Sequence, residues 1–394
     1  MKKDFDLTKK LPPYIFSSIY ELKQKAKAKG LEILDFGMGN PDSGPPQHVM
    51  DRLSELSKDP SMFGYSVVGG VEQLRNANVD YYQRRFGVEL SAEKNCLVTI
   101  GAKEGIASLA TAISSSDDYI VVASPYYPIH KFAFEIAKTG VKEISAISGA
   151  EFLQKFKNLV ESEEKTPLAV IVCFPSNPTT ENVGLEFYEE LVDFCKQKQI
   201  YIISDLAYCE LYFNEESKPH SILEVEGAID VAIEFSSTSK SYSMAGCRVG
   251  FAVGNENLIN ALYKIKSYLD YGSFNPLQIA AVDALSEKSN DYLQDLRKKY
   301  ENRAKFLVDI LQRELDWEIN MPTASMFCWA KLPKNFSASS SFEFCRKLIE
   351  ETGVVFSPGS SFGINGEGYV RISLIHKDED VKRAVGRLKE LFLK

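Results

Sequence analysis

The stretch AIEFSSTSKSYSMAGCRVG, residues 232–250, is the most informative part of this chain. A short apolar run gives way to four small hydroxyl residues, then to the single lysine Lys240, and eight residues later to Arg248. A lysine framed by serine and threonine in an apolar stretch is unusual, because solvated lysines generally have other charges around them. We therefore interpret Lys240 as a reactive amine.

The chemistry of such an amine is specific. Burial at the mouth of a sheet lowers the pKa of a lysine from about 10.4, so that the amine can attack an aldehyde. Ser237, Ser239 and Arg248 are suited to hold an anion beside it, since a planar guanidinium matches a phosphate. An aldehyde next to a phosphate describes pyridoxal 5'-phosphate. The alternative is a helix-capping cluster of hydroxyl residues with a chance lysine, and the rest of the chain decides between the two.

Composition limits the class of protein. The 394 residues suffice for two domains, and a formal net charge of -8 argues against general nucleic-acid binding. Seven scattered cysteines without a CxxC pair indicate reduced thiols of an intracellular protein. The four histidines show no metal-ligand spacing, so we assign them no role and expect no metal site. The longest apolar run, 168–174, is too short to span a membrane, and a cytoplasmic protein is expected.

From residue 96 onward, strands and helices alternate. Apolar runs at 119–123, 168–174, 200–203, 230–235 and 249–253 are separated by segments of helix length. This pattern predicts an α/β fold with a large, doubly wound and mostly parallel sheet covered on both faces. A long amphipathic helix followed by short strands and helices predicts a smaller α+β domain near the C-terminus. We expect the large domain at 46–285 and the small one at 286–394. The N-terminal segment 1–45 is expected to join the small domain.

Polar and aromatic residues follow four of the predicted strands. They are Tyr127 in SPYYP, Asn177 in PSNPTT, Asp205 and Tyr208 in SDLAY, and Lys240. Each one alone has an ordinary explanation, as a turn residue, a helix cap or an amphipathic tyrosine. In doubly wound sheets, however, ligands bind beyond the carboxyl ends of the strands. The shared position of these residues therefore predicts one site.

Other segments add candidates to this site. Ala102 and Lys103 in GAKEG open a helix, and helix N-termini favour anions, although this motif alone is weak. Tyr65 stands in a glycine-flanked loop, where packing is the common explanation and contact with a ligand or partner subunit the other. Gly39 lies in a turn that lets backbone come close to another group. Arg371 lies in a strand after a glycine-rich loop, where a rigid guanidinium can clamp a carboxylate.

Taken together, these motifs resemble the class I/II pyridoxal-phosphate aminotransferases, which share the fold called type I. The motifs, in chain order, are GMGNPD, the Tyr65 loop with GGVEQLR, GAKEG, SPYYP, PSNPT, SDLAY, SSTSKSYSMAGCRVGF, PGSSFG and YVRIS. The opening LPPYIF and the segment SKSYSMAG look most like the branch that contains alanine transaminases and LL-diaminopimelate aminotransferase. The resemblance covers nearly the whole chain.

The resemblance implies a role for each candidate. The catalytic residues would be Lys240, which links to the cofactor aldehyde, Asp205, which pairs with the pyridinium nitrogen, and Tyr208. Other residues would complete the cofactor site: Tyr127 over the ring, Asn177 at its phenolic oxygen, and, at the phosphate, Ala102, Lys103, Ser237, Arg248 and Tyr65 from the other subunit of a homodimer. The substrate α-carboxylate would bind Gly39, Asn177 and Arg371. The implied reaction is ping-pong transamination.

Two departures from the family pattern bear on the substrate. Thr180 stands where the family often has glycine, which predicts a reshaped turn after Asn177. Aspartate-specific members carry an arginine in the loop before Asn-Pro, whereas 263–276 holds none and Asp270 stands near that place. We therefore expect a small neutral donor such as alanine, with 2-oxoglutarate as acceptor. Asp270 near the pocket could instead attract the second ammonium of LL-diaminopimelate.

Several interpretations stay open at the level of sequence. Aspartate, methionine or aromatic donors are alternatives within the aminotransferases. A C–S lyase of the cystathionine type uses the same fold, but after loss of the α-proton it eliminates a group from the β-carbon. A regulatory protein that borrowed the fold is disfavoured, because Lys240 is retained and only a few tens of residues precede the first motif.

Overall fold

The structure, a computed structural model, describes residues 5–12, 15–334 and 338–392 of the chain. The large unit comprises Asn40–Glu301 and Thr323–Ser325, and the small unit comprises Met1–Gly39, Asn302–Pro322 and Met326–Lys394. The division therefore falls inside helix α12 (Asn290–Leu315), whereas the sequence suggested a boundary before that helix, at residue 285. Sequence patterns mark where a helix begins, but packing decides which unit each of its turns joins.

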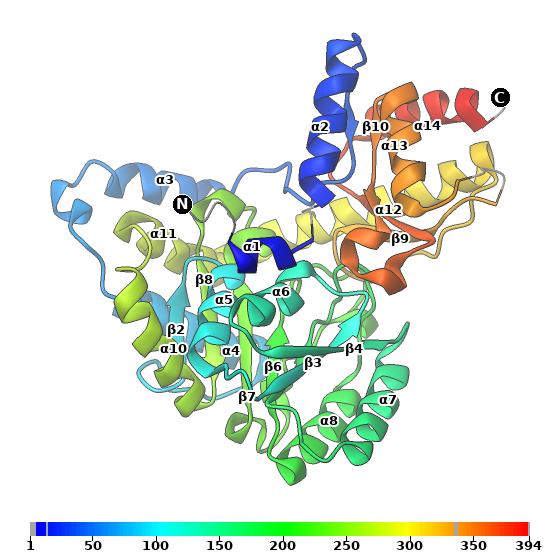
Figure 1. Cartoon of the computed structure of the whole chain (residues 1–394). Coiled ribbons are helices and arrows are strands. Elements are labelled where there is room, and N and C mark those ends of the chain that lie inside the picture. The colour runs from blue at the N-terminus through cyan, green and yellow to red at the C-terminus, as the bar shows by residue number, and fades with distance from the viewer. Residues whose placement is uncertain (1–4, 13–14, 335–337, 393–394) are drawn as a thin grey trace. The chain divides into compact units, whose positions relative to one another are not determined.

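A seven-stranded sheet forms the centre of the large unit (Figure 1), with the strand order β2-β8-β7-β6-β5-β3-β4. Strands β3 to β7 run parallel, while β8 is antiparallel to both β7 and β2. The strands are β2 (Cys96–Thr99), β3 (Tyr119–Ser124), β4 (Gly140–Ser145), β5 (Ala169–Val172), β6 (Tyr201–Asp205), β7 (Ala232–Ser237) and β8 (Gly250–Gly254). The expected large, mostly parallel sheet is confirmed. The apolar runs do not reveal strand β4, because this edge strand is only partly buried and lacks a continuous apolar run.

Helices cover both faces of this sheet, which explains why its central strands are mostly apolar and buried. In β6, Ile202 packs into the core on one face and Ile203 into the core on the other, since successive side chains of a strand point to opposite sides. One face is covered by α5 (Ala102–Ile113), α6 (Pro128–Ile136) and α10 (Glu256–Leu269). The other face is covered by α4 (Glu72–Phe86), α7 (Gly149–Ser162), α8 (Leu185–Lys198) and α11 (Asn275–Leu285).

Short helical segments connect these elements. Helix α3 (Gln47–Leu56) packs against α11. Helix α9 (Thr238–Ser241) directly follows β7, and Ser237 caps it by accepting a hydrogen bond from the Ser239 amide at 3.1 Å. The 3-10 turns of the large unit are η1 (Pro60–Phe63), η2 (Glu215–Ser217), η3 (Ile222–Glu224), η4 (Ala228–Asp230), η5 (Ala245–Cys247) and η6 (Glu287–Ser289).

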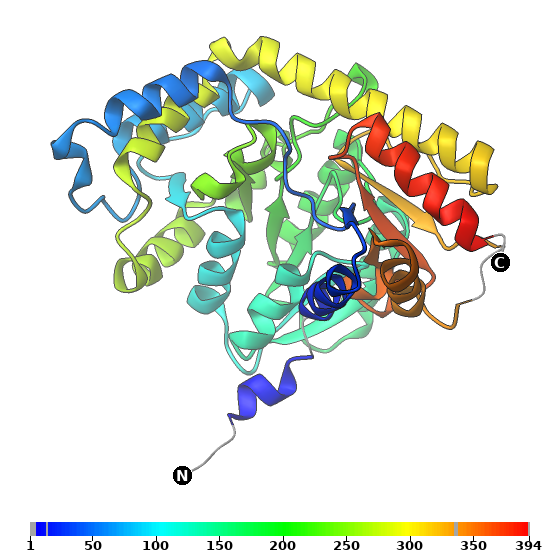
Figure 2. The same cartoon turned by 90° about the horizontal axis from the view of Figure 1, so that it is seen from above.

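The small unit has the α+β composition that the sequence predicted. Strands β11 (Ser357–Pro358), β12 (Tyr369–Ser373) and β9 (Phe327–Lys331) form an antiparallel sheet, and β1 (Leu34–Asp35) pairs in parallel with β10 (Val354–Val355). Helix α2 (Ile15–Ala28) lies beside α13 (Ser341–Thr352), as Figure 2 shows. The other helical segments are α1 (Asp6–Lys10), η7 (Gly359–Phe362), η8 (Ile364–Gly366) and α14 (Asp378–Phe392).

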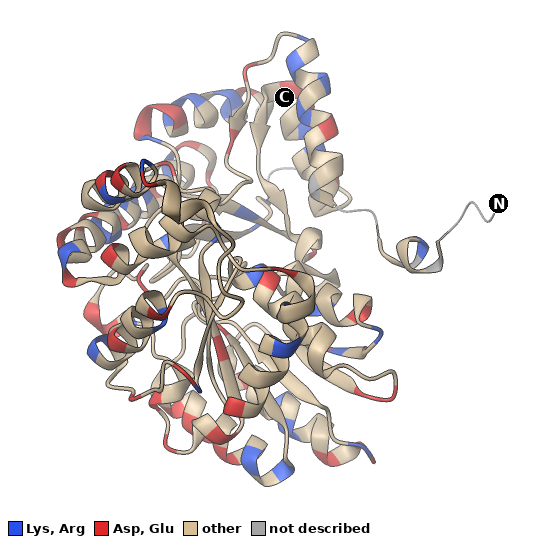
Figure 3. Cartoon of the chain, turned by 90° about the vertical axis from the view of Figure 1, so that its left-hand side faces the viewer, with Lys and Arg blue, Asp and Glu red and all other residues tan. Residues whose placement is uncertain are grey.

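Charged residues of both signs are interspersed over the helices in Figure 3. The alternating signs fit a solvated helical surface with many short ion pairs. Among the described residues, every helix is too short or too polar to cross a lipid bilayer.

Candidate active site

The ends of four neighbouring parallel strands carry the candidate residues. Tyr127 begins α6 after β3, and Asn177 stands in the turn after β5. Asp205 ends β6, and Lys240 lies in α9, immediately after β7. Because β3, β5, β6 and β7 are adjacent and parallel, these groups lie along one edge of the sheet. A fifth residue, Tyr208, joins them: the Asn177 amide nitrogen donates to its hydroxyl at 3.4 Å.

The Asp205 carboxylate is buried, and each of its oxygens has a hydrogen-bond partner. Its Oδ2 lies 2.9 Å from Nε2 of His130, and its Oδ1 accepts from the amide of Ala207 at 3.3 Å. Both side chains are almost inaccessible to solvent. The sequence analysis assigned His130 no role. It lies in the first turn of α6, the helix that follows β3, and therefore at the same edge of the sheet as Tyr127. The Tyr127 ring packs edge-on against the His130 ring, with centroids 5.9 Å apart.

The Cys173 thiol also lies close to His130 and Asp205, and their ligand atoms are within 4.8 Å of one another. Burial and the Asp205 charge raise the pKa of Cys173 well above its usual value, so the thiol stays protonated. The hydrogen bond between His130 and Asp205 by itself holds two of these three ligand atoms 2.9 Å apart.

Around α9, the hydroxyl groups are part of the local backbone structure. The Ser237 hydroxyl lies 3.0 Å from the carbonyl of Val249 and 2.8 Å from the Ser239 hydroxyl. These contacts tie the start of α9 to β8, the antiparallel neighbour of β7. Lys240 is half-buried in the short helix that results. The capping that the sequence offered as an alternative explanation therefore exists, and it fixes the segment that presents the lysine.

Arg248 approaches the beginning of α5. It adopts a left-handed conformation with φ of +56°, is exposed, and donates from Nη2 to the carbonyl of Ile100 at 3.3 Å. Gly101, the N-cap of α5, has φ of +80°, and a Cβ there would overlap the guanidinium. Glycine is thus required both by the backbone and by the arginine. The guanidinium, the helix N-terminus at Ala102 and Ser237 are a donor set suited to a phosphate. Lys103 is exposed beside them.

The fully buried Lys266 forms ion pairs next to the start of α5. The Nζ atom of Lys266 lies 3.1 Å from each carboxylate oxygen of Glu104 and 2.8 Å from Oδ2 of Asp270. Glu104 in turn accepts from the amide of Ile100 at 2.7 Å. Asp270 is therefore engaged as an ion-pair partner, where the sequence suggested that it could attract a substrate ammonium. A lone lysine in an amphipathic helix carries no sequence signal of such burial.

Tyr65 is 87% exposed and lies at the surface of the large unit. Its ring packs against that of Tyr271, with centroids 4.8 Å apart, and Phe63 packs against Phe274 at 5.3 Å. We call these four side chains, which come from two facing loops and are all exposed, the aromatic patch. Exposed clusters of this kind mark contact surfaces for other molecules.

In the small unit, Arg371 is buried and rigidly held. Its guanidinium carbon lies 4.1 Å from the centroid of the Phe327 ring and 4.7 Å from that of Phe362. Its Nη2 donates to the carbonyl of Gly37 at 2.8 Å. Phe327 also explains Gly39, because a Cβ at that residue would overlap the Phe327 ring. The small unit thus brings Gly39 and Arg371 to the same aromatic side chain.

This chain is similar, over nearly its whole length, to known proteins in sequence and in structure. Residues 32–388 match the family described as aminotransferase class I and II. The glutamate-pyruvate aminotransferase AlaC of Escherichia coli is 40% identical over 391 residues, covering 99% of this chain and 94% of that protein. An LL-diaminopimelate aminotransferase of Maridesulfovibrio salexigens is 40% identical, with 97% of each chain covered. Among solved structures, apo-BacF of Bacillus subtilis has a TM-score of 0.91 at 31% identity and covers 99% of this chain and 98% of that one.

Proposed function

This chain belongs to the class I and II aminotransferases, and from that premise we propose that it moves an amino group between L-alanine and 2-oxoglutarate with pyridoxal 5'-phosphate, by a ping-pong mechanism. The observation that carries the proposal is that two candidate catalytic groups stand at the carboxyl ends of neighbouring strands. The Lys240 amine and the Asp205 carboxylate follow the adjacent parallel strands β7 and β6. This edge is where a doubly wound sheet binds its ligand.

The residues of the large unit fit this cofactor. Asp205 is a buried carboxylate that suits a protonated ring nitrogen, and its other partner, His130, keeps it oriented. Gly101 leaves room for the Arg248 guanidinium beside the N-terminus of α5, which suits the phosphate. Tyr208 and Asn177 present a hydroxyl and an amide to the phenolic oxygen. When bound, the cofactor supplies an electron sink for the pair left at the substrate α-carbon.

Individual side chains of this protein would then have separate roles in the reaction. Lys240 would hold the cofactor, and its amine would act as the base that moves the proton from the substrate α-carbon. Asp205 would pair with the ring nitrogen, and Tyr127 would stack on the ring of the cofactor. Arg371 would bind the substrate α-carboxylate as a bidentate donor, with the backbone at Gly39 of the same unit. The stacking of its guanidinium on Phe327 supports this role, since a fixed guanidinium loses little entropy on binding.

Two observations support alanine as the donor. The segment 263–276, which comprises the end of α10, the connecting loop and the start of α11, holds no arginine, so it offers no guanidinium to a second carboxylate. The Asp270 carboxylate is bound by Lys266 at 2.8 Å and by the Gly272 amide at 2.7 Å, so it is poorly placed to receive the distal ammonium of LL-diaminopimelate. The name of AlaC joins glutamate with pyruvate, which is the same exchange in reverse. The LL-diaminopimelate aminotransferases among the relatives keep that donor as the second candidate.

A homodimer with shared active sites completes the proposal. The aromatic patch gives apolar contact area to a second copy of the chain, and Tyr65 within it, being exposed, would contribute to the phosphate site of that copy. We also propose a cytoplasmic location. All seven cysteines are unpaired thiols, which fits a reducing compartment.

Two measurements test the proposed function. Purified protein loaded with cofactor and treated with borohydride should gain the cofactor mass on Lys240, and the Lys240→Ala variant should not. A donor panel of alanine, LL-diaminopimelate, aspartate, methionine and phenylalanine, each with 2-oxoglutarate, should be led by alanine. Faster turnover of aspartate or LL-diaminopimelate would overturn the substrate assignment. Ammonia and pyruvate released from cystathionine without an oxo-acid acceptor would instead indicate a lyase.

A further inference from the structure

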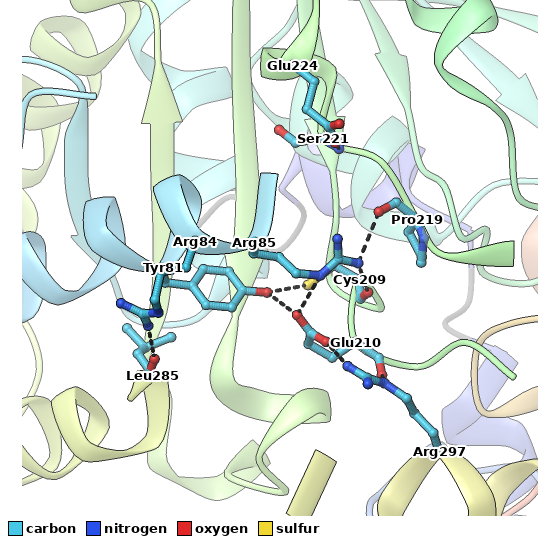
Figure 4. Close-up of polar contacts among 10 residues, drawn as sticks. All are labelled: Tyr81, Arg84, Arg85, Cys209, Glu210, Pro219, Ser221, Glu224, Leu285 and Arg297. Carbon is cyan, nitrogen blue, oxygen red and sulfur yellow. Dashed lines mark hydrogen bonds and ion pairs between the residues drawn. The ribbon is translucent and has the colours of Figure 1, made fainter. Parts of the chain in front are cut away.

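The turn after β6 begins directly after Asp205 and carries Tyr208, and a buried group of charges holds it (Figure 4). We call this group the Glu210 cluster; its members are Tyr81, Arg85, Glu210 and Arg297. Glu210 belongs to the turn itself, two residues beyond Tyr208. The other three members come from helices α4 and α12, so the cluster joins the turn to two helices distant in sequence.

The Glu210 side chain is fixed by three donors. The residue is 1% exposed; its Oε1 accepts from the Tyr81 hydroxyl at 2.5 Å and from Nε of Arg85 at 3.1 Å. Its Oε2 accepts from Nη2 of Arg297. Figure 4 shows these side chains converging on the carboxylate from different elements. Because a buried charge is costly unless it is paired and hydrogen-bonded, the carboxylate has one favourable position.

The same arginines also hold the backbone of the turn. Arg85 donates from Nη2 to the carbonyl of Cys209 at 3.3 Å and to that of Pro219 at 3.1 Å. Arg297 donates from Nε to the carbonyl of Glu210 at 2.9 Å. Each guanidinium therefore binds the side chain of Glu210 and a main-chain carbonyl together. The cluster restrains the path of the turn as well as one side chain.

This restraint reaches Tyr208. The amide of Leu211 donates to the Tyr208 carbonyl at 2.9 Å, and the amide of Leu206 donates to the carbonyl of Phe235 in β7 at 2.8 Å. The turn is thus anchored to the sheet before Tyr208 and to the cluster after it. Between these anchors the Tyr208 hydroxyl meets the Asn177 amide at 3.4 Å.

We propose that Glu210 is a positioning residue that acts through Tyr208: its ion pairs with Arg85 and Arg297 set where the Tyr208 hydroxyl stands. This inference rests on the proposed function, in which that hydroxyl donates to the phenolic oxygen of the cofactor. Glu210 itself touches neither substrate nor cofactor in this account. Its effect is on the geometry of one hydrogen bond.

The test reads that hydrogen bond directly. The absorbance of pyridoxal phosphate linked to a lysine changes with pH as the linkage loses its proton. A hydroxyl that donates to the phenolic oxygen stabilises the deprotonated form and lowers the midpoint. We expect Tyr208→Phe to raise the midpoint, and Glu210→Gln to raise it by a smaller amount, about half a pH unit. In the Tyr208→Phe background, Glu210→Gln should add nothing, because the group through which it acts is gone.

A milder variant and a matched control cover the case in which Glu210→Gln does not fold. Tyr81→Phe removes only the hydroxyl that donates to Glu210, and it should raise the midpoint in the same direction. Tyr82→Phe, one residue further along the same helix, removes a buried hydroxyl that donates to Glu234 at 3.0 Å instead. It should leave the midpoint at the wild-type value. Melting temperatures of all variants separate loss of stability from displacement of Tyr208.

The outcomes are distinct. If Glu210→Gln and Tyr81→Phe lower the melting temperature but leave the midpoint unchanged, the cluster is only structural and the inference is wrong. If wild-type protein shows no lysine-linked absorbance at all, the proposed function fails first. In that event a crystal structure of the Tyr81→Phe protein without cofactor still decides the inference. A Tyr208 hydroxyl displaced from Asn177 supports it, and an unmoved one overturns it.

Discussion

Nε2 of His130 lies 2.9 Å from Oδ2 of Asp205, and both side chains are buried at the carboxyl edge of the sheet. The imidazole holds one oxygen of the carboxylate, so the carboxylate keeps a fixed orientation at the edge of the sheet. Because His130 follows β3 and Asp205 follows β6, only the folding of the sheet brings the pair together.

Replacing His130 by phenylalanine should therefore weaken cofactor binding. The ring volume is kept, but Oδ2 of Asp205 loses its partner and the carboxylate is no longer held in one orientation. We expect the affinity for pyridoxal phosphate to fall by about 10- to 100-fold, the range known for losing the hydrogen bond that orients a metal-binding side chain. Cofactor titration followed by absorbance measures this. As a control, His220→Phe removes a histidine that contacts Glu224 near the surface and should change nothing.

Lys266→Met should destabilise the large unit. Its amine is fully buried between Glu104 and Asp270, and methionine leaves those two carboxylates close together without a counter-charge. Breaking a buried ion pair in this way costs about 3 to 5 kcal/mol. Urea unfolding followed by circular dichroism checks the loss. Lys264→Met, at an exposed position of the same helix, should change stability by less than about 0.5 kcal/mol. Equal effects of the two variants would contradict the prediction.

Stability should depend on pH through Glu234 in β7. Burial raises the pKa of this carboxyl to about 7, although Ser221, Ser204, Ile222 and Tyr82 donate to it. The folded protein thus binds this proton more tightly than the unfolded chain, whose ordinary value is 4.5. The resulting stability is complete below pH 4.5 and is lost as the pH rises through about 7, for a total of about 3 kcal/mol.

Glu234→Gln should remove this dependence, because an amide does not titrate. The melting temperature of the wild type relative to the variant should therefore fall between about pH 5 and pH 8. The exposed Glu226→Gln should show the wild-type profile. A wild-type protein that gained stability relative to Glu234→Gln over this range would show that the sign is wrong.

Thr180→Gly should stabilise the turn that carries Asn177. Thr180 has φ of +63°, a left-handed conformation that costs a β-branched residue about 1 to 2 kcal/mol. Glycine relieves this but loses about 0.5 to 1 kcal/mol through its greater freedom when unfolded, so the net gain is at most about 1.5 kcal/mol. Chemical denaturation measures it. Thr179→Gly, with no such strain to relieve, should destabilise the protein instead, and activity should persist in Thr180→Gly because Asn177 is kept.

The order of residues along the chain was enough to predict the α/β class, the sheet strands other than β4, and the residues that follow them. Apolar runs of strand length and the small residues after them are local properties, so Lys240, Asp205 and Asn177 could be chosen without a structure. Their shared edge followed from parallel strand order alone.

The buried partners that hold the site and its surroundings in place are known only from the folded structure. His130 meets Asp205, Lys266 meets Asp270 and Glu104, and Arg85 with Arg297 meets Glu210. Most of these partners are far apart in the sequence, and each choice depends on how helices pack across the sheet. A buried histidine or lysine looks the same in sequence as an exposed one, because its partner is selected by packing geometry and by the free-energy cost of leaving a charge unpaired away from water.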